Sequence, residues 1–122
     1  MRNIQSGFTL VELVIVIIIL GLLAAVAVPK FIDLSSDAKT AATNSVAASL
    51  SAANSINYAS RKENAAKGSA VVNCTDTSSL LQGGLPSGYT ITAAAVAVDT
   101  TVSCTLTGPG STTATFSATG IS

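Results

Sequence analysis

The 122-residue chain lacks the side chains on which most protein chemistry depends. It has no histidine, no tryptophan and only two cysteines, and 10% of its residues are charged, against about 25% in typical soluble domains. Without histidine, zinc ligation and general-base catalysis lose their commonest side chain. The six basic and six acidic residues balance, so no basic surplus is available to hold a nucleic-acid backbone. Zinc sites and nucleic-acid enzymes are therefore excluded, and the length predicts one small domain.

Apolar residues are abundant, at 48% of the chain, and they concentrate in one stretch. Residues 8–28 read FTLVELVIVIIILGLLAAVAV, and Glu12 is their only charged residue. As a helix with a rise of about 1.5 Å per residue, this stretch would span about 31 Å, close to the hydrocarbon thickness of a bilayer. The sequence therefore predicts one membrane-spanning helix at 8–28.

Three interpretations of the first 30 residues fit this pattern. The first is a secretory signal peptide, with Arg2 as its charged region and the small residues at 25–27 as its cleavage site. The second is a plain single-pass anchor that needs no processing. The third is a short hydrophilic leader, residues 1–7, which is cut after Gly7 so that the apolar stretch stays in the mature protein.

Glu12 discriminates between these interpretations. A carboxylate in an apolar span costs about 2 to 3 kcal/mol to insert and is usually kept for a role. Neither a signal peptide nor a bare anchor has a use for it. Cleavage after Gly7 gives it a partner, because the new ammonium on Phe8 stands four residues before Glu12, about one helical turn away. The position of Glu12 therefore favours the third interpretation.

The same residues carry a family resemblance. The sequence GFTLVE at 7–12, followed by the apolar run and Pro29, resembles the N-terminus of type IV prepilins and of the related type II secretion pseudopilins. The resemblance implies that a prepilin peptidase cuts after Gly7 and that Phe8 becomes the N-methylated first residue. It also implies that the subunit is held in the bacterial inner membrane before assembly. The pilus assembly machinery would then polymerise copies of the subunit into an extracellular filament. The sequence PKFIDLSSDA at 29–38 is similar to a segment of mannose-sensitive haemagglutinin-type pilins.

Beyond Pro29 the apolar pattern becomes one-sided and predicts an amphipathic helix that ends at about Tyr58 or Ser60. At 100° per residue, Asp33 and Asp37 lie opposite an apolar stripe. The residues of this stripe are Phe31, Leu34, Ala38, Ala42, Val46, Ala53 and Ile56.

Gly21 and Pro29 weaken the apolar half of the helix. Proline removes one backbone hydrogen bond, and glycine costs about 1 kcal/mol relative to alanine. We predict that the helix unwinds across 21–29 when the subunit leaves the membrane for the filament, and the resemblance implies the same.

The C-terminal part reads as strands and turns. Residues 89–98, 101–107 and 112–118 are rich in Thr and Val, and short turn sequences at 99–100 and 108–110 separate them. One face of the second strand would carry Val102, Cys104 and Leu106. One face of the third would carry Ala114, Phe116 and Ala118. The expected fold class is α+β, with a long N-terminal helix packed against a small antiparallel sheet, as the type IV pilin fold would have it.

The two cysteines are predicted to be bonded to each other. Cys74 lies in the loop after the helix and Cys104 in a strand, and an exported protein meets an oxidising compartment. A disulfide that closes this loop would contribute about 3 to 4 kcal/mol, which a thin core needs. Two free buried thiols are the alternative. A CxxC spacing is absent, which disfavours a metal or redox pair, and the Asn73-Cys74-Thr75 sequon matters only in a host that glycosylates asparagine.

No catalytic constellation emerges from the remaining residues. Asp33, Asp37, Asp76 and Asp99 are scattered, and the many Ser and Thr residues have no base to activate them. We therefore expect no enzyme activity, cofactor, metal or specific nucleic-acid site.

The predicted function is that of a major pilin whose filament serves adhesion, motility or DNA uptake, with Glu12 and the Phe8 ammonium setting the register of assembly. The expected division is a leader at 1–7, a helix at 8–60 with a change of character at 28–29, and a head at 61–122. A type II secretion pseudopilin and a secreted binding domain that starts at Val28 are the alternatives.

Overall fold

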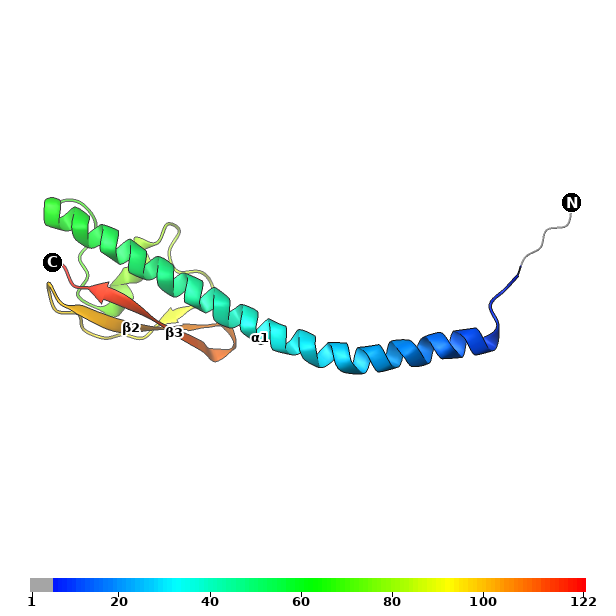
Figure 1. The fold of residues 1–122 in the computed structure, drawn as a ribbon. Coiled ribbons are helices and arrows are strands. Elements are labelled where there is room, and N and C mark those ends of the chain that lie inside the picture. The colour runs from blue at the N-terminus through cyan, green and yellow to red at the C-terminus, as the bar shows by residue number, and fades with distance from the viewer. Residues whose placement is uncertain (1–5) are drawn as a thin grey trace, which may run out of the picture. The chain divides into compact units, whose positions relative to one another are not determined.

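The structure, a computed structural model, describes residues 6–122, and its elements are shown in Figure 1. A single long helix, α1 (Leu10–Glu63), is followed by a head with three strands. The strands form one antiparallel sheet in the order β1-β2-β3, which confirms the α+β class. The elements after α1 are η1 (Cys74–Leu80), β1 (Thr90–Ile91), β2 (Thr101–Gly108), η2 (Pro109–Ser111) and β3 (Thr112–Thr119).

The chain forms two compact units, which divide α1 between Ser35 and Ser36. In the N-terminal unit, α1 begins at Leu10 and continues through Gly21 and Pro29. The β-branched residues of the apolar run cost only a few tenths of a kcal/mol each in a helix, so a long run of them does not prevent one. In this single chain the helix is unbroken at 21–29, and unwinding of that segment stays a prediction for the assembled filament. Most of the predicted leader, residues 1–5, lies outside the described residues.

In the second unit, Ser36–Ser122, α1 packs against the head along a face that differs from the predicted stripe. Ala38, Ala42 and Ile56 are exposed, and Val46 and Ala53 are only half-buried. The predicted stripe was therefore wrong. Hydropathy misplaced it because most of the residues that face the head are polar and hydrogen-bonded to it. The buried residues of α1 are Thr43, Ala47, Leu50, Asn54 and Asn57.

The helix also ends at Glu63 rather than at Tyr58 or Ser60. Arg61 and Lys62 lie in its last turn, where cations interact favourably with the helix dipole.

Two of the three predicted strands are confirmed. β2 and β3 pair from Thr101 opposite Thr119 to Gly108 opposite Thr112, and their apolar residues face the core as expected. Figure 1 shows the green part of α1 running alongside these two strands.

The predicted strand at 89–98 is confirmed only in part. Thr90 and Ile91 pair with β2, and Thr92 N–H donates to the Thr105 carbonyl at 3.0 Å. The following residues bend away to meet the loop at 71–74 instead: Cys74 N–H donates to the Ala94 carbonyl at 2.9 Å, and Val96 N–H donates to the Val72 carbonyl at 2.8 Å. The run of alanines at 93–95 has little preference for a strand, so these competing bonds decide its path.

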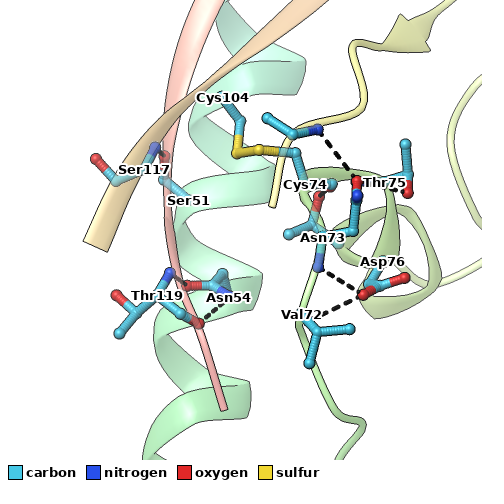
Figure 2. The surroundings of a disulfide bond; sticks show 12 residues. Ser51, Asn54, Val72, Asn73, Cys74, Thr75, Asp76, Cys104, Ser117 and Thr119 are labelled. Atoms are coloured by element: carbon cyan, nitrogen blue, oxygen red, sulfur yellow. Dashed lines mark hydrogen bonds between the residues drawn. A yellow bond between two sulfur atoms is a disulfide. The ribbon is translucent and has the colours of Figure 1, made fainter. Parts of the chain in front are cut away.

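The core of the head lies between α1 and the sheet and contains the disulfide. Cys74 and Cys104 are bonded, as predicted, and both are buried (Figure 2). The bond joins the start of η1 to the middle of β2, so it fixes an irregular segment to the sheet. The buried apolar cluster consists of Ala47, Leu50, Cys74, Val96, Cys104, Leu106, Phe116 and Ala118.

Candidate assembly site

The first turn of α1 is closed by a reciprocal pair of side chains. Thr9 precedes the helix, and its N–H and hydroxyl both donate to Glu12 Oε2, at 2.8 and 3.0 Å. Glu12 N–H donates in return to the Thr9 hydroxyl at 3.2 Å. This is a capping box, which satisfies backbone N–H groups that have no partner within the helix. The carboxylate of Glu12 is therefore held at the very start of the helix.

The predicted cleavage site lies beside this carboxylate. Ser6, Gly7, Phe8 and Glu12 line a hollow of about 220 Å³. Phe8 is 91% exposed, so the bond between Gly7 and Phe8 is open to an enzyme. In the uncut chain, the Phe8 nitrogen is an uncharged amide. Cleavage after Gly7 would create an ammonium on the border of the hollow that Glu12 also lines.

A long stretch of exposed apolar side chains begins at the same point. The large apolar side chains from Phe8 to Leu34 are between 44% and 91% exposed. By length and composition, α1 is able to cross a membrane. Such a surface is stable only in lipid or against other protein. The site therefore brings together the carboxylate of Glu12 and the predicted cleavage position between Gly7 and Phe8. Both lie at the start of a helix whose exposed apolar surface would be covered by lipid or by other protein.

A row of polar side chains, which hydropathy alone assigns to solvent, fixes α1 to the head. Asn54 Oδ1 accepts from Thr119 N–H at 2.7 Å, and its Nδ2 donates to the Thr119 carbonyl at 3.2 Å. The Ser51 hydroxyl accepts from Ser117 N–H at 3.0 Å (Figure 2). Together these two side chains cover part of the free edge of β3, which would otherwise be able to pair with another chain.

Asn57 repeats the arrangement on the loop that follows α1. Its Oδ1 accepts from Ser69 N–H and its Nδ2 donates to the Ser69 carbonyl, both at 2.8 Å. Asn54 and Asn57 are three residues apart and so lie on one face of the helix, which could have indicated a shared contact with the head. Polar residues on a helix are, however, usually assigned to solvent.

A charged cluster joins the end of α1 to the turn before β2. Lys62 Nζ lies 2.6 Å from Asp99 Oδ1, and the Tyr58 hydroxyl donates to the same oxygen at 2.9 Å. The bonds from Lys62 and then Tyr58 lower the pKa of Asp99, and the bond to Asp99 raises the pKa of Lys62. Asp99 has a φ of 59°, a left-handed conformation that Asp adopts more readily than most residues.

Asn73, the asparagine of the sequon, is occupied as the cap of η1. Its Oδ1 accepts from Thr75 N–H at 3.2 Å, from the Thr75 hydroxyl at 3.0 Å and from Ala94 N–H at 3.3 Å. Asp76 completes a capping box by accepting from Asn73 N–H (Figure 2). Both residues therefore have structural roles at the start of η1.

The structure thus brings together Gly7, Phe8 and Glu12, and it bonds Cys74 to Cys104. Gly21 and Pro29 lie further along the same helix, away from this site. Within residues 6–122, no group of three or more acidic or cysteine side chains is placed to hold a metal ion.

Comparison with known proteins gives two kinds of match. Residues 2–28 match the family model described as the prokaryotic N-terminal methylation motif. The type IV narrow pilus major component PilA5 of Thermus thermophilus is 39% identical over 99 residues, which are 81% of this chain and 78% of that protein.

Other matches are shorter. The type IV major fimbrial protein FimA of Dichelobacter nodosus is 55% identical over 31 residues, 25% of this chain and 20% of that protein. The type IV major alpha-pilin of Moraxella bovis is 55% identical over 38 residues, 31% of this chain and 24% of that protein. No solved structure matches the chain.

Proposed function

The chain belongs to the type IV pilin family, and from that premise we propose that it is the major structural subunit of a type IV pilus. Members of this family are structural proteins and not enzymes. The observation that carries the proposal is the placement of Glu12 beside the Gly7–Phe8 bond, at the start of an exposed apolar helix.

The first step is removal of the leader, residues 1–7, by a prepilin peptidase. The methylation motif supports this step, as does the exposure of Phe8 at the border of the hollow. Phe8 then becomes an N-methylated, positively charged first residue. The cut leaves the apolar part of α1 in the mature subunit, which is held in the bacterial inner membrane by residues 8–28.

The second step is polymerisation into an extracellular filament. Apolar helices leave lipid and pack on one another, so their surface is never exposed to water. A smooth apolar rod has many positions of nearly equal energy along its neighbour. Glu12 makes one of these positions preferred. In any other register its carboxylate would be buried without an ammonium beside it, at a cost of about 3 to 5 kcal/mol. The Phe8 ammonium, of the same subunit or of an adjacent one, is the partner in the correct register.

Two finer points of the proposal rest on sequence alone. The PKFIDLSSDA segment at 29–38 supports a place within the mannose-sensitive haemagglutinin-type group. Adhesion, motility and DNA uptake are the roles that such a filament serves, on a head surface rich in Ser and Thr.

The experiment that tests the proposal is mass spectrometry of the subunit in purified surface fibres, together with electron microscopy of those fibres. A chain that begins with methylated Phe8 and forms the main component of the fibres is expected. A chain that begins at Val28 would identify a secreted domain, and an intact N-terminus would identify a simple anchor. A correctly processed chain that never enters surface fibres would favour a type II secretion pseudopilin.

A further inference from the structure

A short apolar segment of α1, residues 30–34, lies between the proposed membrane span and the head, and we call it the juxtamembrane segment. Its side chains Phe31, Ile32 and Leu34 are 70%, 65% and 61% exposed. They belong to the N-terminal unit, in which every described residue, 6–35, is exposed. A cluster of large apolar side chains that stays exposed marks a site of contact with lipid or with other protein.

Two charged residues bracket the apolar span and place this segment relative to a bilayer. After Glu12, the next charged residue along the chain is Lys30. At about 1.5 Å per residue, the two lie about 27 Å apart along α1. The hydrocarbon core of a bilayer is about 30 Å thick, and the headgroup layers add about 5 to 7 Å on each side. When the helix spans the core, both charges lie at its edges, and residues 31–34 fall within one headgroup layer.

The side chains of the juxtamembrane segment divide into two sides. At about 100° per residue, Phe31, Ile32 and Leu34 fall within an arc of about 160°, and Lys30 and Asp33 lie on the opposite side. The same division places an amphipathic helix at the interface of a bilayer, where its apolar side enters the lipid and its charged side stays in water. The long stem of Lys30 also lets its ammonium reach lipid phosphates while its methylenes stay in apolar surroundings.

Pro29 lies directly before the juxtamembrane segment. It has no N–H to bond with the Ala25 carbonyl, so α1 has one hydrogen bond fewer to hold it straight at this point. A bend there tilts the helix axis after it leaves the hydrocarbon core and brings the apolar side of the segment onto the lipid. The unit that contains the head begins soon after this segment, at Ser36.

We propose that the juxtamembrane segment binds the headgroup layer of the membrane, on the side that carries the head, before the subunit is assembled. Phe31, Ile32 and Leu34 enter the acyl border of that layer, and the Lys30 ammonium pairs with lipid phosphates. The segment thereby fixes how far α1 enters the membrane. This inference rests on the proposed function, because it concerns the subunit while residues 8–28 hold it in the membrane.

Tryptophan fluorescence tests the contact, because the chain has no tryptophan of its own. The full chain with Phe31→Trp is placed in vesicles of phosphatidylcholine and phosphatidylglycerol in equal parts. Phospholipids brominated close to the headgroup should quench this tryptophan more strongly than phospholipids brominated at the end of the acyl chains. That order of quenching places the side chain in the headgroup layer.

Two further single-tryptophan variants of α1 are the matched controls. Leu20→Trp lies in the middle of the span and should show the opposite order, with stronger quenching by bromines at the chain ends. Ile56→Trp replaces a side chain of the head unit that is 69% exposed, almost as much as Phe31, and neither lipid should quench it. Circular dichroism of each variant in the same vesicles shows that the helix is retained.

Removing the ammonium of Lys30 measures its part in the contact. In the Phe31→Trp protein, Lys30→Leu should move the tryptophan deeper, because a lysine resists entry into the hydrocarbon core. The ratio of quenching near the headgroup to quenching at the chain ends should therefore fall. Lys39→Leu removes an exposed lysine beyond the segment and should leave this ratio unchanged. An equal ratio in the two proteins would overturn the role of Lys30.

The outcomes separate this inference from the proposed function. If neither lipid quenches Leu20→Trp, residues 8–28 do not span the bilayer and the membrane step of the proposed function fails. If Leu20→Trp is quenched from the chain ends and Phe31→Trp is not quenched at all, only the juxtamembrane contact is wrong. Emission of Phe31→Trp that moves to shorter wavelength without quenching by either lipid would mean that a second copy of the chain covers this position, and would also overturn the contact.

Discussion

Asn54 of α1 holds Thr119 of β3 by both atoms of its side-chain amide, at 2.7 and 3.2 Å. The helix thereby supplies the hydrogen bonds that a neighbouring strand would supply. Ser51 extends the same contact to Ser117. This part of the β3 edge is therefore not free to pair with a strand of another chain.

Replacing Asn54 with Ala should lower the free energy of unfolding of the head by about 1 to 3 kcal/mol. The Thr119 N–H and carbonyl would lose their hydrogen-bond partner, and Asn54 itself is only 1% exposed to solvent. Urea unfolding of the full chain in detergent micelles measures this. Tyrosine fluorescence reports on the head, since the tyrosines are Tyr58 and Tyr89. Ser49→Ala, at an exposed position of the same helix, is the control and should stay within about 0.5 kcal/mol of the unmodified chain. Equal values for the two variants would show that the Asn54 contact contributes nothing.

Glu12→Ala and Glu12→Gln should both leave a processed subunit in the membrane that polymerises poorly. The glutamine variant keeps an oxygen that accepts the bonds from Thr9, so it separates the capping role from the charge. Fibre yield, measured by immunoblot of sheared surface material, should fall for both variants by a similar factor. Glu63→Gln is the control, because it neutralises an exposed carboxylate elsewhere on α1. It should leave the fibre yield unchanged. Normal yield from Glu12→Gln would contradict the register role of the carboxylate.

Removing the disulfide with Cys74→Ala and Cys104→Ala together should cost about 3 to 4 kcal/mol, as expected for a loop with a sequence separation of 30. The physical reason is the larger conformational freedom of the unfolded chain. Because both sulfurs are buried, a reductant should act on the folded protein only slowly and on the urea-unfolded protein at once. Thiol labelling followed over time in both states checks this. Fast labelling of the folded protein would show that the head opens more easily than its burial indicates.

The contact between Asp99 and Lys62 should make a contribution to stability that depends on pH. The pKa of Asp99 is lowered in the folded state, so its contribution is fully present above the ordinary value of 3.8 and is lost as the pH falls through the lower folded value. The pKa of Lys62 is raised, so its contribution is present below 10.5 and is lost as the pH rises through the higher folded value.

The difference in unfolding midpoint between the unmodified chain and Asp99→Asn should therefore be constant between pH 5 and 9 and should shrink below about pH 4. Asparagine tolerates the left-handed backbone at this position, so the substitution tests the charge and not the turn. A difference that stays unchanged down to pH 2 would mean that the ion pair is not the source of the effect.

In a density map of the assembled filament, residues 21–29 should appear extended, because Pro29 lacks the N–H that would bond to the Ala25 carbonyl and Gly21 is a weak helix former. The isolated chain is helical there. Pro29→Ala with Gly21→Ala should retain the helix in the filament and alter its rise per subunit. Unbroken helix in the filament of the unmodified chain would refute the prediction.

The N-terminal unit was predictable from sequence, because its structure depends on local patterns. The apolar run sets the helix, and the spacing of Gly7, Phe8 and Glu12 places the site without any long-range contact. The strands β2 and β3 were predictable for the same reason, since their alternation of Thr with apolar residues repeats every two positions.

The contact between α1 and the head was not predictable in this way. Hydropathy assigns Asn54 and Asn57 to solvent, whereas both are buried by bonds to backbone groups of Thr119 and Ser69 that are distant in sequence. The short β1 has a similar origin. Its continuation was lost to bonds with the loop around Asn73, which follows from the disulfide and the cap of η1 rather than from strand preference.

The boundary between Ser35 and Ser36 also separates the side-chain contacts that α1 makes. Every side-chain hydrogen bond from α1 to the head starts at Thr43 or later, so substitutions in the head leave the anchor chemistry untouched.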